Sequence, residues 1–322
     1  MKKSILALLL AVLMVASLLP AAALADDTWT EVNTAEALTA ALEKGGNIKL
    51  TEDITVDSQQ NWTVSKNVVL DLNSCDIVSS YGKINNYLFV VNSASLTVTD
   101  NSEDKTGTIE ATHSSYGYGI QLKGTNSSFT LLGGTIKTTQ ETVDIQDYAK
   151  NTSITITGGK LISTADSVLG VRGSGTVVNI TGGEMVSNGR TGVYISYYGN
   201  PDSIKFNMTS GTLTHTGGAS GAIQMYKGAT LTFGGDAKIT SSSYAVQVQE
   251  NTILNVTGGT LETTGSTAVT AGETSTVNIS GGTISSTGYN GCALELEDSA
   301  KAEISGGELK NKITKSGADS TI

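Results

Sequence analysis

Acidic and basic side chains that could act on a polysaccharide lie close together in the middle of the chain. Asp144 and Asp147 are near neighbours, and Arg172 follows them. Closely set carboxylates can serve as general acid and general base in glycoside hydrolysis. A cluster of three carboxylates is missing, however, so a solvated ion pair between Asp144 and Arg172 is the alternative interpretation. The sequence leaves a catalytic site and a surface ion pair both open.

Tyrosines form a second group, with the chemistry of ligand binding. An insertion at residues 194–202 contains several of them and the one proline that follows residue 25. Aromatic rings stack on the C–H faces of sugars, and an amide such as that of Gln224 can hydrogen-bond beside them. The alternative is that these rings merely cover exposed strand ends. The residues predicted to bind a glycan, besides Gln224, are Tyr148, Tyr194, Tyr197, Tyr198 and Tyr226.

Other kinds of site find little support in the sequence. Cys75 and Cys292 lie too far apart along the chain to expect a disulfide. His113 and His215 do not show the spacing of metal ligands, so no metal site is predicted. Calcium is conceivable, but no aspartate-rich glycine nonapeptide supports it, and no other cofactor is expected. The net charge of −10 speaks against a nucleic-acid partner.

A glycine-tagged repeat must position these residues. Segments such as ITGGKLIS, ITGGEMVS and VTGGTLET recur along the chain every 23 to 28 residues. Each repeat contains three short stretches in which apolar residues occupy every second position, which is typical of strands with one buried face. This pattern predicts an all-β fold, a parallel β-solenoid of about ten coils with three strands per coil. The second glycines of the tags are residues 134, 159, 183, 211, 235, 259, 282 and 307.

Alignment of the repeats predicts which residues share a face. In the middle strand of each coil, apolar pairs such as Ile120/Leu122 and Val143/Ile145 are expected to point inward. The residue between each pair should then point outward, so that these residues form one ladder along the solenoid. Arg172 would lie one coil from Asp144. The predicted outward ladder is Gln121, Asp144, Gly170, Tyr194, Gln224, Gln247, Thr270 and Glu295.

The two ends of the chain differ from the repeats. Residues 1–25 combine a basic start, an apolar run and an Ala-Leu-Ala site, which predicts a signal peptide and a secreted, extracellular protein. Residues 26–47 are expected to form an N-terminal cap with a helix at 35–44, begun by Thr34 and ended by Gly45. The solenoid should span 48–310 and a polar tail 311–322, with association through the C-terminal edge possible in principle. No further apolar run is long enough to span a membrane.

The signal peptide, the cap in TAEALTAALEKGGNIKL and the ITGGTI-type coils together resemble the right-handed parallel β-helix, or pectin-lyase-like, superfamily. The resemblance is greatest to secreted bacterial repeat proteins described as carbohydrate-binding or adhesin-like. It implies right-handed coiling and a polysaccharide or surface glycan as partner. The leading prediction is a secreted, non-catalytic glycan-binding or adhesin-like protein. The alternatives are a polysaccharide lyase or glycoside hydrolase that uses Asp144, Asp147 and Arg172, and a purely structural surface spacer.

Overall fold

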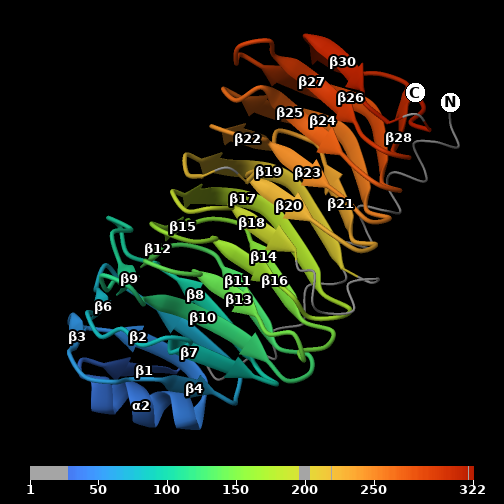
Figure 1. Ribbon diagram of the computed structural model, residues 1–322. Coiled ribbons are helices and arrows are strands. Elements are labelled where there is room, and N and C mark those ends of the chain that lie inside the picture. The colour runs from blue at the N-terminus through green and yellow to red at the C-terminus, as the bar shows by residue number, and fades with distance from the viewer. Residues whose placement is uncertain (1–27, 196–203, 219, 318) are drawn as a thin grey trace, which may run out of the picture.

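The computed structural model describes residues 28–195, 204–218, 220–317 and 319–322. Strands from successive repeats stack in parallel and in register, because the repeats return apolar side chains to the same inward positions. The result is an elongated parallel β-solenoid of about ten turns (Figure 1). One continuous apolar core fills it from Val32 to Ala302. The predicted signal peptide lies outside the described residues.

Two parallel sheets form the wall of the solenoid. The 11-stranded sheet contains the middle strand of each repeat. Its strands are β4 (Trp62–Val64), β7 (Tyr87–Asn92), β10 (Tyr118–Lys123), β13 (Val143–Ile145), β16 (Leu169–Val171), β18 (Val193–Ile195), β20 (Ile223–Met225), β23 (Val246–Val248), β25 (Thr267–Ala271), β27 (Cys292–Leu296) and β30 (Lys312–Lys315).

The 19-stranded sheet contains the segments on both sides of the glycine tags. Its strands are β1 (Trp29–Val32), β2 (Gly46–Leu50), β3 (Ile54–Val56), β5 (Val68–Asp71), β6 (Ile77–Ser79), β8 (Ser95–Thr99), β9 (Thr108–Ala111), β11 (Ser128–Leu131), β12 (Thr135–Thr138), β14 (Ser153–Ile156), β15 (Lys160–Ser163), β17 (Val177–Ser187), β19 (Lys205–His215), β21 (Thr230–Phe233), β22 (Lys238–Ser241), β24 (Ile253–Thr263), β26 (Thr276–Ser286), β28 (Lys301–Ile304) and β29 (Glu308–Lys310).

The glycine tags lie where this sheet bends. Gly183 has a φ of +78°, a conformation that favours glycine, and a Cβ there would lie 2.8 Å from the carbonyl oxygen of Gly158. In β17, β19, β24 and β26 the chain passes through the bend as one 11-residue strand. In other coils, as at β11 and β12, two strands flank it. Three separate strands per coil therefore describe only part of the solenoid.

A short helix covers the N-terminal end of the solenoid (Figure 1). Helix α2 spans Ala35–Lys44; the Thr34 hydroxyl accepts a hydrogen bond from the Ala37 N–H, and the Gly45 N–H donates to the Ala41 carbonyl. Its apolar face, with Leu38 and Leu42, is buried against the core. The sequence-based prediction of this helix and of both its caps is confirmed.

At the C-terminal end, strand pairing continues beyond residue 310, where the sequence placed the start of a polar tail. Strand β30 pairs in parallel with β27, and Thr321 then bridges to Lys301 beside β28. Part of the expected tail therefore extends the solenoid. Association through this edge stays a prediction.

The cysteines agree with expectation. Cys75 and Cys292 are both free thiols, and Cys292 is buried. Within the described part of the chain, no helix has the length and apolar character needed to cross a membrane.

Candidate functional site

The outward ladder predicted from the sequence is present on the 11-stranded sheet. Its residues pair one after another in parallel register, while their strand neighbours point into the core. We call this ladder the outer strip. It consists of Gln121, Asp144, Gly170, Tyr194, Gln224, Gln247, Thr270 and Glu295.

Arg172 lies beside the strip and binds two carboxylates. Its guanidinium is 3.1 Å from Oε1 of Glu141, which precedes β13, and its other terminal nitrogen is paired with Asp144. Asp144 is only 4 % exposed and Glu141 9 %, whereas the Arg172 side chain keeps 25 % of its surface exposed. The ion pair is therefore largely buried rather than solvated, and part of the Arg172 side chain remains accessible.

Gly170 creates the space for this arrangement. It occupies the outward position between Asp144 and Tyr194. A Cβ at Gly170 would lie 2.7 Å from Oδ1 of Asp144 and 2.8 Å from a guanidinium nitrogen of Arg172. A side chain at this position would therefore force the ends of the Asp144 and Arg172 side chains to shift.

Further polar groups complete the surroundings of Asp144. The Gln121 amide donates a hydrogen bond of 3.4 Å to Oδ2, and the Tyr87 hydroxyl donates to the same carboxylate. Burial raises the pKa of Asp144 above its usual range, although Arg172 and these hydrogen bonds oppose the shift. Burial also raises the pKa of Glu141. The acceptor sites of Asp144 are thus directed at protein donors.

The sequence did not indicate Glu141, Tyr87 and Tyr118 as members of this group. The rings of Tyr87 and Tyr118 contact each other in a tilted arrangement, with their centroids 4.9 Å apart, on the N-terminal side of Asp144. Burial, followed by the nearby Asp144 and Glu141, raises the pKa of Tyr87 far above its ordinary value. The register pairing of Tyr118 with Tyr87 is the signal that could have found the two rings, because it follows from the same alignment.

Aromatic rings continue the site on the other side of Arg172. The guanidinium carbon lies 5.9 Å from the ring centroid of Tyr194, within cation–π range. Tyr194 in turn meets Tyr226 edge to face at 6.0 Å. The next strands contribute amides, and Gln224 donates a hydrogen bond of 2.8 Å to Gln247. A charged group, two rings and two amides therefore adjoin on one outer face.

The remaining predicted residues do not join this group. Tyr148 is 85 % exposed and has no ring contact within the described part of the chain, because it lies in the turn after β13. Asp147 is exposed in the same turn and forms no ion pair with any described residue. Tyr197 and Tyr198 lie outside the described residues.

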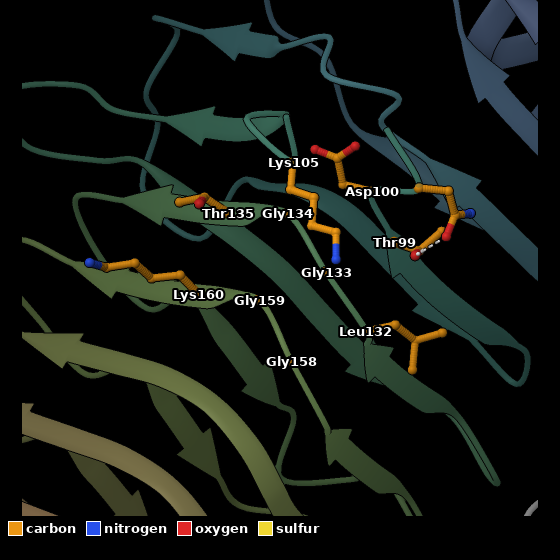
Figure 2. A pocket seen from close by; sticks show the side chains of 11 residues that line it. Thr99, Asp100, Lys105, Leu132, Gly133, Gly134, Thr135, Gly158, Gly159 and Lys160 are labelled. Carbon is orange, nitrogen blue, oxygen red and sulfur yellow. Dashed lines mark hydrogen bonds between the residues drawn. The ribbon is translucent and has the colours of Figure 1, made fainter. Parts of the chain in front are cut away.

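A separate hollow lies at the glycine bend of the first coils (Figure 2). Its volume is about 690 Å³, because the glycines of two tags, 133–134 and 158–159, carry no side chains there. Asp100 lies at the edge of this hollow, but the Asp100 carboxylate accepts hydrogen bonds from the backbone N–H groups of Ser74, Ser102 and Gly107. This carboxylate therefore stabilises the local loop. No group of three or more metal-binding side chains occurs among the described residues.

The geometry defines an all-β solenoid with a polar and aromatic strip on one outer face. No protein-family model matches the chain, and no curated protein matches it in sequence. Among solved structures, it is similar to the surface protein and adhesin PfbA of Streptococcus pneumoniae, at 11 % identity and a TM-score of 0.36, over 89 % of this chain and 95 % of that one. A second PfbA structure gives 10 % identity and a TM-score of 0.29, over 89 % of both chains. Similarity this low carries no inference about function.

Proposed function

We propose that the protein is a secreted, non-catalytic, adhesin-like solenoid that binds a polysaccharide or surface glycan on its outer strip. The observation that carries this proposal is the convergence of Arg172, Tyr194 and Tyr226 on neighbouring coils of one outer face. Each of the three comes from a different repeat, so the general repeat pattern does not require them to meet.

The chemistry of these groups suits a sugar. Aromatic rings offer their faces to the C–H groups of a pyranose, and guanidinium and amide groups hydrogen-bond to its hydroxyls. The buried carboxylates of Glu141 and Asp144 fix the orientation of Arg172 before any ligand arrives. Groups fixed on a rigid β-solenoid lose little conformational entropy on binding, which favours affinity.

A panel of immobilised polysaccharides, scored for retention and for depolymerisation, tests the proposal. We expect the wild type to be retained on at least one polymer without degrading it. The variant Tyr194→Ala/Tyr226→Ala should bind at least about tenfold more weakly, since stacking on one ring contributes on the order of 1 kcal/mol. Tyr289→Ala is the matched control, because that ring is 92 % exposed and precedes β27, several coils from Tyr194 in β18 and from Tyr226. Retention of no polymer, or equal retention of both variants, contradicts the proposal.

The proposed contact surface extends to the other tyrosines predicted from the sequence. Tyr148 projects from the turn after β13 into solvent, where it can reach a long ligand. Tyr197 and Tyr198 follow β18 directly in the sequence. A second variant, Tyr197→Ala/Tyr198→Ala, measures their contribution separately from that of Tyr194 and Tyr226.

A second candidate function is that of a polysaccharide lyase or glycoside hydrolase. The geometry that favours it is the contact of two carboxyl groups, those of Glu141 and Asp144, with Arg172 on one outer face, because closely set carboxyl groups can serve in acid–base catalysis. This function predicts depolymerisation in the same panel, with new ultraviolet absorbance if the product is an unsaturated uronate. Arg172→Ala should abolish it. If no polymer in the panel is shortened, the enzyme function is rejected. If, in addition, no polymer is retained, the result favours a structural spacer.

A further inference from the structure

We propose that the outer strip selects an uncharged polysaccharide and discriminates against carboxylated or sulfated chains. This inference rests on the proposed function, and it names the chemical class of the ligand. It follows from the charges along the strip, from the amides in its middle, and from one buried hydroxyl that has no partner.

The guanidinium of Arg172 is already neutralised. Arg172 is paired with Asp144 and Glu141 together, so the cluster as a whole carries excess negative charge. An anionic sugar that approached Arg172 would meet these two carboxylates at the same time. Arg172 is therefore suited to donating hydrogen bonds to hydroxyls and unsuited to attracting a carboxylate.

The middle of the strip carries no charged side chain at neutral pH. From Gly170 to Thr270 the outward positions are glycine, tyrosine, glutamine, glutamine and threonine. Gln224 and Gln247 are half-buried and joined to each other, and both amides keep further donor and acceptor capacity. Near Tyr226, Arg190 and Glu250 contribute charges of opposite sign. Such a surface matches the hydroxyl groups of a neutral sugar.

Carboxylates lie towards both ends of the strip. Asp144 and Glu141 lie at the N-terminal end, and Glu295 and Glu297 at the C-terminal end. Burial, and then the charge of Glu295, raises the pKa of Glu297, as expected where negative potential accumulates. Lys123, at the end of β10, is the remaining cation of these positions. Arg172 and Lys123 offset the two carboxylates at the N-terminal end, whereas Glu295 and Glu297 would repel an anionic polymer at the C-terminal end.

Thr270 supplies an independent sign of a ligand hydroxyl. It points outward between Gln247 and Glu295, is 3 % exposed, and its Oγ1 has no hydrogen-bond partner among the described residues. A buried hydroxyl without a partner is unfavourable, because it has lost its hydrogen bonds to water and gained none in the protein. A sugar hydroxyl can both donate to it and accept from it.

The test compares polymers that differ only in charge. The probes are hydroxyethyl cellulose with carboxymethyl cellulose, and dextran with carboxymethyl dextran, added to the general panel and run in affinity electrophoresis. We expect the carboxylated member of a retained pair to bind about tenfold more weakly at low ionic strength, and the gap to narrow as salt is added. A gap that does not narrow with salt overturns the inference.

Two variants connect the selectivity to the strip. The variant Glu295→Gln/Glu297→Gln should reduce the difference in affinity between the neutral and the carboxylated polymer by about threefold, because it removes the charges at the C-terminal end of the strip. Thr270→Val should bind the neutral polymer several-fold more weakly while its melting temperature stays equal or rises, since it removes an unsatisfied buried hydroxyl without changing the shape. A purely structural Thr270 would leave affinity unchanged, and that result counts against the inference.

The outcomes separate the two proposals. Retention of an acidic polymer in preference to neutral ones overturns the present inference but leaves glycan binding intact. Retention of neutral polymers alone supports both. Retention of no polymer in the whole panel overturns both.

Discussion

Gly170→Ala is the sharpest perturbation of the candidate site. The residue sits on the outer face with an ordinary backbone conformation, so alanine causes no backbone strain. Its methyl group would nevertheless lie 2.7 Å from Oδ1 of Asp144 and 2.8 Å from Arg172. Because carbon and oxygen atoms normally stay more than 3 Å apart, the carboxylate and the guanidinium must separate or shift outward together.

The magnitude follows from opposing contributions. Weakening a charge-assisted hydrogen bond at a buried pair is unfavourable by about 1.5–3 kcal/mol. Replacing glycine by alanine at a compatible position stabilises by about 0.4–1 kcal/mol through the unfolded chain. Arg172 keeps its contact with Glu141, which limits the damage. We therefore expect a net loss of about 1–2 kcal/mol in the free energy of unfolding, and a several-fold loss of glycan affinity as Arg172 moves.

Chemical denaturation and affinity electrophoresis on the retained polymer measure the two effects. Gly272→Ala is the matched control, because Gly272 directly follows β25 of the same sheet and its added methyl would meet its nearest neighbour, Glu297, at 3.5 Å, an ordinary contact distance. That variant should be as stable as the wild type or slightly more so. If Gly170→Ala proves as stable as Gly272→Ala and binds as well as the wild type, the ion pair is not held in the way described here.

Three further predictions concern buried polar groups. Asp144→Ala should lower the free energy of unfolding by about 2–3 kcal/mol, because it leaves the partly buried Arg172 with one carboxylate partner instead of two. The control Glu184→Ala removes an exposed ion pair and should lower the free energy of unfolding by less than about 0.5 kcal/mol. Equal losses for the two variants in chemical denaturation would contradict the argument from burial. His215 is buried and its pKa is lowered by that burial, so stability should fall as pH drops below about 6.5, and thermal melts of His215→Gln should show a smaller fall between pH 7.5 and 5.5 than those of the wild type. Burial raises the pKa of Asp100, but hydrogen bonds to its carboxylate lower it more, so the stabilisation by this carboxylate should be present above about pH 4 and lost below. In Asp100→Asn, the free energy of unfolding should therefore fall less steeply below about pH 4 than in the wild type. An unchanged fall would mean that other groups cause the loss of stability in acid.

Much of the fold could be predicted because the sequence repeats it. Apolar residues at every second position specify which face of each strand is buried, and the glycine tags fix the alignment between repeats. The predicted pairs Ile120/Leu122 and Val143/Ile145 are register partners in the structure. The helix at Ala35–Lys44 was equally readable, since its first and last capping residues satisfy backbone groups locally.

The candidate site was only partly predictable, because alternation along a strand predicts the direction of a side chain but not its burial or its contacts. Asp144 and Arg172 were placed on the correct face, yet their burial depends on Gly170, which lets the guanidinium lie across the strand. Glu141 comes from the turn before β13, where no alternation applies. Tyr148 was grouped with Tyr226 by repeat position, but its turn directs it into solvent. The bends that merge two strands into one, as in β17, likewise depend on local hydrogen bonding that repeat spacing does not encode.

Specific function in a solenoid must therefore come from outward positions that depart from the repeat. Inward positions are constrained by the stacked core, in which one altered side chain disturbs its neighbours above and below. Outward positions are free of that constraint, and most of them here carry small or uncharged polar side chains. A buried arginine–carboxylate cluster is costly to desolvate and is often no more stabilising than apolar packing. The proposed function accounts for its presence on the outer face, next to the edge-to-face rings of Tyr194 and Tyr226 and beside a glycine that makes room for it, because a glycan ligand would need Arg172 held in place.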